Sequence, residues 1–260
     1  MNHRIDLVAD LGEGFGDWRM GDDAALLEVV TSANVACGFH AGDPRIMDRT
    51  VAECVRRGVN IGAHPSFPDL VGFGRRAIDA TPEEVRTDVI YQLGALQAFA
   101  VAHGSQVHHL APHGRLGNLV AVRADYAAAV VDAVRSVDDR LLVLAQDGEL
   151  ADAARSAGLA VGIVGIADRA YEDDGTLVPR SEPGAVIHDP AEIARRALRM
   201  VTRQSIASRH GREVPTRVDT ILLHGDSAVA LEAARTVRQE LQRAGVEVGP
   251  LTREGVRQEG

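Results

Sequence analysis

Four histidines follow short apolar runs of the chain, each near the point where its run ends. They are His40, His64, His113 and His224. Imidazole groups transfer protons near neutral pH, and with carboxylates they also bind divalent metal ions. If the runs are neighbouring strands, the four side chains meet at one edge of a sheet. The pattern therefore predicts a pocket for acid–base or metal-assisted chemistry, and the presence and identity of a metal stay open.

Charged residues of both signs lie near the same run ends. These candidates are Asp10, Glu13, Asp43, Asp168, Asp226, Arg75, Arg76 and Arg169. The carboxylates are candidates for proton transfer, although an acidic residue after a strand also caps helices, which is the alternative for Glu13. The planar guanidinium group matches a carboxylate, so the arginines are interpreted as substrate-binding. Asp43 is counted with them, although Asp43 before Pro44, like Thr81 before Pro82, is also a plausible helix cap. For Arg75 and Arg76 a solvated pair at the start of a helix is the alternative.

Positioning these residues requires several strands and helices. Seven apolar runs of strand length occur, namely RIDLVAD, SANVACGF, GVNIGAH, QVHHLAP, RLLVLAQ, LAVGIVG and DTILLHG. Segments with helical spacing are 22–31, 43–57, 81–103, 121–136, 148–157, 189–209 and 227–244. Continuously apolar strands that alternate with helices indicate a parallel sheet covered on its faces.

An open doubly wound sheet and a closed β/α barrel both fit this alternation. The dinucleotide-binding sheet requires G-x-G-x-x-G after the first strand, and the glycines at 12, 14 and 16 do not have that spacing. We therefore expect a single seven-stranded β/α barrel over residues 1–250. An inserted loop or hairpin is expected near 166–190, and a tail over 251–260.

Composition excludes several classes of function. The net charge of −9 argues against a nucleic-acid partner, and no apolar run is long enough to span a membrane. The 28 basic residues are all arginines, so a lysine Schiff base is excluded. Two cysteines are too few for a disulfide framework, and Cys37 is expected to be buried. The start MNHRIDLVADLGE lacks the apolar core of a signal peptide. A cytoplasmic protein is expected.

Seven segments of the chain, in order from about residue 5 to 230, are DLGEGFG, SANVACGFHAGDP, IGAHPS, PDLVGFGRR, PHG, ADRAYEDDGTLVPR and LLHGD. Together, and in this order, they resemble the LamB/YcsF family. The resemblance implies a seven-stranded barrel similar to polysaccharide deacetylases and some glycosidases. It also implies an enzyme, an ATP-hydrolysing 5-oxoprolinase, that opens the lactam ring of 5-oxo-L-proline to L-glutamate. ATP, with Mg²⁺, would be the co-substrate, and the B and C subunits of that enzyme would be the partners. Homo-oligomerisation stays open.

All the candidate residues above coincide with positions typical of the family. Three positions depart from it: Val8, Ala111 and Val164 replace an asparagine, a lysine and a glutamate. Losing these polar groups near strand ends indicates a changed substrate or a weaker activity. The same departures leave a non-catalytic subunit that binds partners as one alternative. The implied fold similarity and the set Asp10, His40 and His64 leave a metal-dependent deacetylase or amidase as another.

Overall fold

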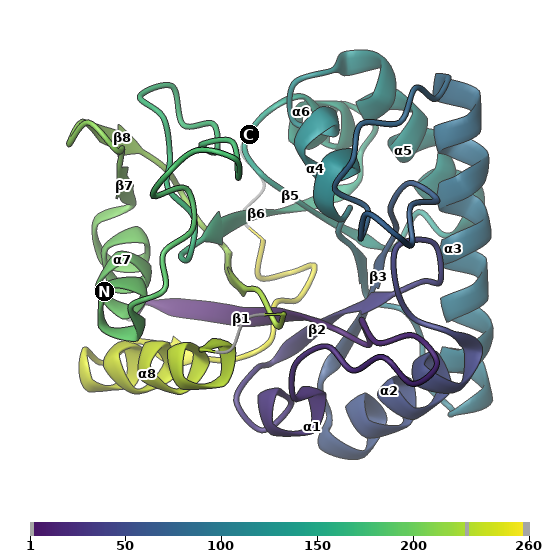
Figure 1. Cartoon of the computed structure of the whole chain (residues 1–260), viewed down its shortest axis with the longest axis horizontal. Helices are drawn as coiled ribbons and strands as arrows, with labels where there is room; N and C mark the ends of the chain where they lie inside the picture. Colours follow the sequence, from purple (N-terminus) through teal and green to yellow (C-terminus); the bar gives the residue numbers. More distant parts are fainter. Residues whose placement is uncertain (1–2, 227–228, 257–260) are drawn as a thin grey trace.

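Seven parallel strands close into a barrel in the computed structural model, which describes residues 3–226 and 229–256 (Figure 1). The barrel strands are β1 (Arg4–Leu11), β2 (Ser32–Ala36), β3 (Asn60–His64), β4 (His109–Leu110), β5 (Leu142–Ala145), β6 (Ala160–Ile166) and β9 (Thr220–Leu223). Each pairs with the next, and β9 pairs with both β6 and β1. In the closing register Val8 lies opposite Ser32 on one side and Leu222 on the other. The predicted fold is confirmed.

Helices pack around the outside of the strands (Figure 1). They are α1 (Asp23–Leu26), α2 (Pro44–Arg57), α3 (Pro82–Ala102), α4 (Gly114–Val120), α5 (Ala124–Val137), α6 (Glu149–Ser156), α7 (Pro190–Arg203) and α8 (Ala230–Arg243). Asp43 and Thr81 cap the starts of α2 and α3, as their position before proline predicts. Gly58 ends α2 with φ +67°, a conformation that glycine adopts without strain.

Three helix predictions differ from the structure. The segment 189–209 is helical only to Arg203, because the chain then forms the antiparallel pair β7 (Ser205–Ala207) and β8 (Glu213–Pro215). The helix expected over 22–31 is the single turn α1, and α4 was not expected at all. The first two residues of the helix expected over 227–244 lie outside the described residues.

The segment 166–190 folds over the carboxyl end of the barrel with little regular structure. Two isolated antiparallel bridges, Arg169 with Val186 and Tyr171 with Leu177, hold it together. Ala170, Val178 and Ala185 form a small buried cluster of their own within it. The insertion is therefore a compact loop, which stays close to the strand ends because it carries its own apolar contacts.

The last described residues run along the amino end of the barrel. β10 (Glu247–Val248) pairs with the start of β1, and the Leu251 carbonyl accepts a hydrogen bond from Asn60. Val256 is buried, whereas residues 257–260 of the expected tail lie outside the described residues. Among the described helices none has the length and hydropathy to cross a membrane.

Candidate active site at the carboxyl end of the barrel

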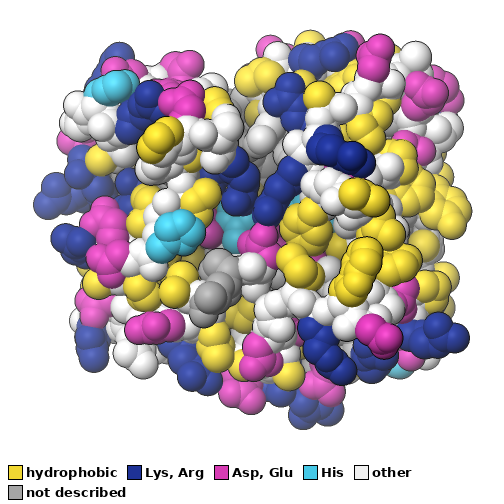
Figure 2. Space-filling model, in the orientation of Figure 1, with side chains coloured by type: hydrophobic (Ala, Val, Ile, Leu, Met, Phe, Trp, Pro, Cys, Tyr) yellow, Lys and Arg dark blue, Asp and Glu magenta, His cyan; other side chains and the backbone are white. Residues whose placement is uncertain are grey.

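The strand ends bring the predicted histidines together, as ring closure requires. His64 ends β3, His40 and His113 follow β2 and β4, and His224 follows β9. Figure 2 shows a hollow near the middle of this face, where histidine atoms lie beside arginine and acidic side chains. A closed parallel barrel places active sites at this end of its strands. The predicted convergence is thus present in the structure.

Three of these histidines form a buried cluster with two carboxylates. His64 Nε2 lies 3.3 Å from Asp10 Oδ1 and 3.0 Å from His113 Nδ1. Glu13 Oε1 lies 3.5 Å from His40 Nε2 and 3.6 Å from His113 Nδ1. The rings of His40 and His113 stack with centroids 3.8 Å apart. All five residues are at most 4% exposed, so water does not screen their charges.

Backbone carbonyls fix the orientation of two of the rings. His64 Nδ1 donates to the Ala111 carbonyl over 2.6 Å, and His113 Nε2 donates to the Phe73 carbonyl over 2.9 Å. A carbonyl only accepts hydrogen bonds, so these contacts decide which nitrogen of each ring carries its proton. The other nitrogen of each ring, His64 Nε2 or His113 Nδ1, faces into the cluster.

A strained turn covers the cluster from outside. Phe73 has φ +54°, and its ring meets those of His40 and His113 edge to face. At Gly74, also at positive φ, a Cβ atom would lie 2.9 Å from His40 and 2.3 Å from Ser66 Oγ. Only glycine allows the backbone to pass this close. The turn therefore depends on the glycine-flanked sequence GFG and excludes water from the histidines.

The two carboxylates have pKa values pushed in opposite directions. Burial disfavours the charged form of Asp10, but the charge and hydrogen bond of His64 together with the charges of His224 and His113 outweigh burial and lower the pKa of Asp10. Burial raises the pKa of Glu13 well above its usual range, and the charges of Asp10 and Asp226 raise it further. Burial also lowers the pKa values of His40 and His113. Without an added cation the cluster therefore carries one firmly ionised carboxylate, Asp10.

Several polar atoms of the cluster have no hydrogen-bond partner within the described residues. These atoms are Glu13 Oε1 and both ring nitrogens of His40. Together with His64 and His113 they form a set of four residues whose donor atoms all lie within 4.8 Å of one another. Unpaired buried polar groups are costly, so their presence marks a place built for something other than stability. Within residues 3–226 and 229–256, this set has the residue types and donor spacing to hold a metal ion.

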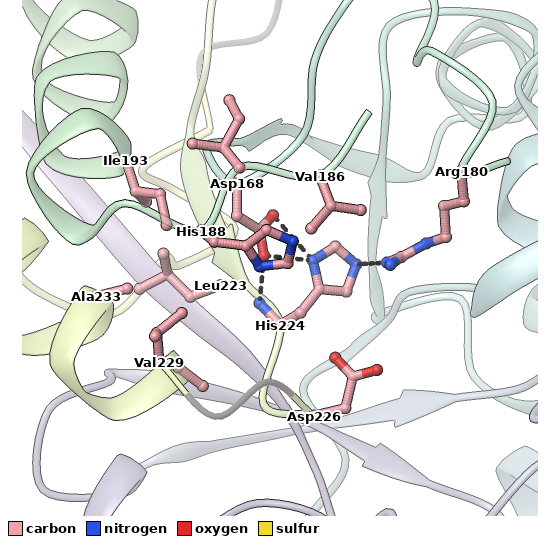
Figure 3. A pocket seen from close by; sticks show the side chains of 12 residues that line it. Asp168, Arg180, Val186, His188, Ile193, Leu223, His224, Asp226, Val229 and Ala233 are labelled. Atoms are coloured by element: carbon pink, nitrogen blue, oxygen red, sulfur yellow. Dashed lines mark hydrogen bonds and ion pairs between the residues drawn. The ribbon is translucent and has the colours of Figure 1, made fainter. Parts of the chain in front are cut away.

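A second group lies beside the cluster (Figure 3). His224 Nδ1 contacts the Asp168 carboxylate over 2.8 Å, and Arg180 Nη2 approaches His224 Nε2 to 3.0 Å from the opposite side. Burial lowers the pKa of His224, but the charge and hydrogen bond of Asp168 together with the charge of Asp10 outweigh burial, so the pKa is raised. Arg75 pairs with Asp226 over 2.6 Å. This second group therefore offers a protonatable imidazole between the Asp168 carboxylate and the Arg180 guanidinium group, and it includes a second guanidinium group, Arg75, paired with Asp226.

Three predicted substrate-binding residues are engaged elsewhere. Asp43 accepts hydrogen bonds from Arg45 N and Ile46 N as the cap of α2, and from Gly16 N. Arg76 pairs with Asp69 on the outside of the turn. Arg169 is buried and donates to the carbonyls of the insertion that it holds together. The structure does not bring these three side chains into the cluster.

Three contributors were missed by the sequence reasoning or given little weight. Asn34 donates to Asp10 and accepts from His109 Nε2. His109 is buried inside the barrel, and its ring fills the space where Gly62 lacks a side chain. Arg180, from the inserted loop, contacts His224 Nε2. Alternation along the strands could have placed Asn34 inside, because Asn34 pairs in register with Asp10 and Gly62.

Two of the three positions that depart from the family pattern, Ala111 and Val164, line an apolar recess beside His64. Ala111, Val164, Leu144 and Leu222 form its walls, and its volume is about 60 Å³. Ala111 still supplies the carbonyl that orients His64, because that contact uses the backbone. The third position, Val8, is buried in the core. The departures therefore change a wall of the site and leave its carboxylates and imidazoles complete.

Cysteine chemistry is not part of this site. Cys37 is buried, and its thiol donates to the Val35 carbonyl. Burial raises its pKa to about 12, so the thiol stays protonated. The expectation that Cys37 is buried is confirmed.

Comparisons with known proteins identify relatives of the whole chain. The sequence model described as LamB/YcsF family matches residues 5–255. A relative from Methylococcus capsulatus, named as the A subunit of 5-oxoprolinase, is 51% identical over 252 residues, covering 96% of this chain and 97% of its own.

Solved structures agree with the barrel. A lactam utilization protein from Thermus thermophilus superposes with a TM-score of 0.90 at 45% identity, covering 95% of this chain and 100% of its own. A family 4 carbohydrate esterase from Streptomyces lividans superposes with a TM-score of 0.53 at 14% identity, covering 99% and 97%. The esterase shares the fold alone.

Proposed function

Because the chain belongs to the LamB/YcsF family, we propose that it is the A subunit of an ATP-hydrolysing 5-oxoprolinase. In this role it opens the lactam ring of 5-oxo-L-proline to give L-glutamate, together with the B and C subunits. Relatives that carry the name of this subunit, about half identical over nearly their whole length, support the assignment. The observation that carries the chemistry is the group of buried carboxylates and imidazoles beside Arg75 and Arg180 at the barrel end.

An unstrained lactam resists water, and ATP provides the activation. Transfer of the terminal phosphoryl group to the lactam oxygen releases ADP and leaves a phosphorylated imidate. Water then adds to the ring carbon, the carbon–nitrogen bond breaks, and the nitrogen takes up a proton, which leaves an acyl phosphate. A second water hydrolyses this acyl phosphate to glutamate and phosphate. The site must therefore supply a base for water, an acid for nitrogen and a cation for the substrate carboxylate.

Asp10 is the base in this proposal. Its carboxylate is buried, ionised and oriented by the hydrogen bond from Asn34. A lowered pKa makes it a weak base in the resting site, but it is the carboxylate that stays free of a proton near neutral pH. A well-placed base of this kind contributes roughly 10²–10⁴ in rate.

His224 is the acid that protonates the leaving nitrogen. Asp168 holds its Nδ1 and raises its pKa, so the ring takes a proton near neutral pH more readily than a free histidine. In the resting site Arg180 occupies the face of Nε2. Rotation of Arg180 toward a substrate carboxylate frees this nitrogen for protonation. Two groups with pKa values pushed apart, Asp10 and His224, then divide the base and acid roles.

Arg75 and Arg180 bind the substrate carboxylate, and the recess takes the hydrocarbon edge of the ring. Both guanidinium groups belong to the second group of residues, with His224, Asp168 and Asp226. Burial and the neighbouring charge of Arg75 lower the pKa of Arg180. The apolar walls at Ala111 and Val164 suit ring methylene groups, and the recess has the volume of about two water molecules. ATP with Mg²⁺ acts as co-substrate of the assembled enzyme in the cytoplasm.

The test is glutamate formation from 5-oxoproline. The chain alone, the B and C subunits without it, and all three together are assayed with and without ATP, after gel filtration has shown that the subunits are folded and associated. We expect glutamate only from the full mixture with ATP. Activity of the chain alone without ATP would instead support a metal-dependent amidase, and no glutamate from the associated complex would refute the assignment.

Neighbouring arginines provide a matched control for substrate binding. Arg75→Gln should raise the KM for 5-oxoproline at least about tenfold, because it removes a charge-assisted contact. Arg76→Gln should leave KM within about twofold, because Arg76 pairs with Asp69 on the outside of the turn. Equal changes of KM in the two variants would contradict the assignment of substrate binding to Arg75 and not to Arg76.

A further inference from the structure

We propose that Glu13, His40, His64 and His113 bind one divalent transition-metal ion of the zinc type. The proposal concerns the isolated chain and goes beyond the lactam-opening function. All four side chains are buried, and one donor atom from each lies within 4.8 Å of the others. Three independent features point to a cation among them: the orientation of two rings, the unpaired atoms of the other two residues, and the spacing of the donors.

The first feature is a pair of nitrogens that face each other. His64 donates through Nδ1 to Ala111 O, and His113 donates through Nε2 to Phe73 O. Each neutral ring has only one N–H, so His64 Nε2 and His113 Nδ1 both present lone pairs. These two nitrogens are 3.0 Å apart. Two lone pairs at this distance repel unless a cation lies between or beside them.

A proton alone satisfies only part of the site. Protonated His64 could donate to His113 Nδ1 or to Asp10 Oδ1, 3.3 Å away. Glu13 Oε1 and both nitrogens of His40 would still have no partner among the described residues. A metal ion uses all four groups at once.

The spacing of the donors fits a tetrahedral ion. Ligands about 2.0–2.1 Å from zinc are separated by roughly 3.3 Å along the edges of the tetrahedron. The corresponding separations here are 3.0 Å from His64 to His113, 3.5 Å from Glu13 to His40 and 3.6 Å from Glu13 to His113. These three separations need shifts of only a few tenths of an ångström, whereas the whole donor set extends to 4.8 Å. The ring of His40, stacked on that of His113, must also turn to direct its nitrogen at a shared ion. The carbonyls of Ala111 and Phe73 hold two ligands from behind, as outer-shell partners of metal-bound histidines do.

The donor set also selects the kind of metal. Three imidazole nitrogens and one carboxylate suit Zn²⁺, Co²⁺, Ni²⁺ or Fe²⁺, whereas Mg²⁺ prefers oxygen ligands and retains several waters. The bound ion supplies a positive charge beside Asp10, at the end of the barrel where the lactam is expected. This site is therefore distinct in chemistry from the Mg²⁺ that accompanies ATP.

Metal content and affinity of the isolated chain test the proposal. Protein freed of metal with a chelator is titrated with Co²⁺, followed by its visible absorption, and with Zn²⁺ in competition with a chelating dye. We expect one ion per chain and no comparable binding of Mg²⁺. Glu13→Gln and His40→Asn should weaken Zn²⁺ binding by roughly 100-fold or more, because each removes a direct ligand. Circular dichroism verifies that each variant is folded.

His103→Asn is the matched control, because it removes a partly exposed histidine that pairs with Asp48 on the surface. It should leave the stoichiometry and affinity unchanged. Failure of the chain to bind Zn²⁺ or Co²⁺, or equal binding by folded Glu13→Gln, would overturn the proposal. Because the titration contains neither 5-oxoproline nor ATP nor the other subunits, either result leaves the lactam-opening function to its own assay.

Discussion

Each end of the barrel buries a carboxylate, but the two carboxylates differ in their hydrogen bonds. At the amino end Asp6 Oδ1 accepts from Thr31 and Ser32 over 2.6 and 2.8 Å, and Oδ2 accepts from Thr220 over 2.6 Å. At the carboxyl end Glu13 Oε1 has no hydrogen-bond partner among the described residues. Asp6 and Glu13 are 1% and 4% exposed, so water does not explain the difference.

This contrast separates a carboxylate that joins strands from one held ready for a ligand. Asp6 links β1 to the start of β2 through Ser32 and to β9 through Thr220, so its hydrogen bonds close the barrel. Glu13 and His40 join no strands and face other titratable groups. Proteins retain unpaired buried polar groups at functional sites at a cost in stability. Substitutions at the two ends should therefore affect different measurements.

The largest effect is expected at the carboxyl end. Asp10→Asn keeps the size of the side chain and an oxygen that can accept from Asn34, but it removes the charge. Turnover of the assembled enzyme should fall by roughly 10²–10⁴, because the base for water is lost. The free energy of unfolding should fall as well, by about 1–3 kcal/mol, because the lowered pKa of Asp10 means that the folded protein favours its charged form. Steady-state glutamate formation and urea unfolding measure the two quantities, and full activity in Asp10→Asn would remove Asp10 from the mechanism.

At the amino end the expected loss is in stability. Asp6→Ala leaves the hydroxyls of Thr31, Ser32 and Thr220 without their acceptor, which should cost about 3 kcal/mol of unfolding free energy in urea titrations. Asp6→Asn retains an acceptor and should lose less. Turnover of the folded fraction should remain close to that of the unchanged protein.

The stability difference at Asp6 has a pH dependence with a defined sign. Burial raises the pKa of Asp6 above its ordinary value of 3.8, despite the hydrogen bonds that oppose the shift. A raised folded-state pKa stabilises the protein below 3.8, and this contribution is lost as pH rises through the folded-state value. The difference in unfolding free energy between the unchanged protein and Asp6→Asn should therefore shrink from about pH 4 toward about pH 7. A difference that grows over this range would contradict the shift.

The fold was predictable because its signals are local and repeated. Runs such as RIDLVAD and DTILLHG are apolar throughout, and Asp43 and Gly58 delimit a helix by their own backbone preferences. Prediction failed at residues 204–209, where a helix was expected but residues 205–207 pair with 213–215. That pairing is a tertiary contact, which no local pattern contains.

The site was predictable in its membership and less so in its arrangement. Parallel strands in a closed barrel bring His40, His64 and His113 together, so their strand-end positions were informative. The position of Arg169, by contrast, depends on the path of the inserted loop. Its guanidinium group donates hydrogen bonds to the carbonyls of Ala185 and Val178 within that loop. The facing nitrogen lone pairs of His64 and His113 result from hydrogen bonds to the carbonyls of Ala111 and Phe73. The spacing of residues in the sequence does not specify these hydrogen bonds.

The smallest predicted effect concerns Asp43. Substitutions there test whether this residue binds substrate or only stabilises the start of α2. Asp43 caps α2 through Oδ1 and holds Gly16 N through Oδ2, so both oxygens are already used. Asp43→Ala should cost about 1 kcal/mol of unfolding free energy, and Asp43→Asn, which still caps, only a few tenths. Both variants should keep the KM for 5-oxoproline within about twofold. A tenfold higher KM at unchanged stability would instead return Asp43 to the substrate-binding residues, and would mean that the functional region reaches the rim of the barrel beyond the histidine cluster.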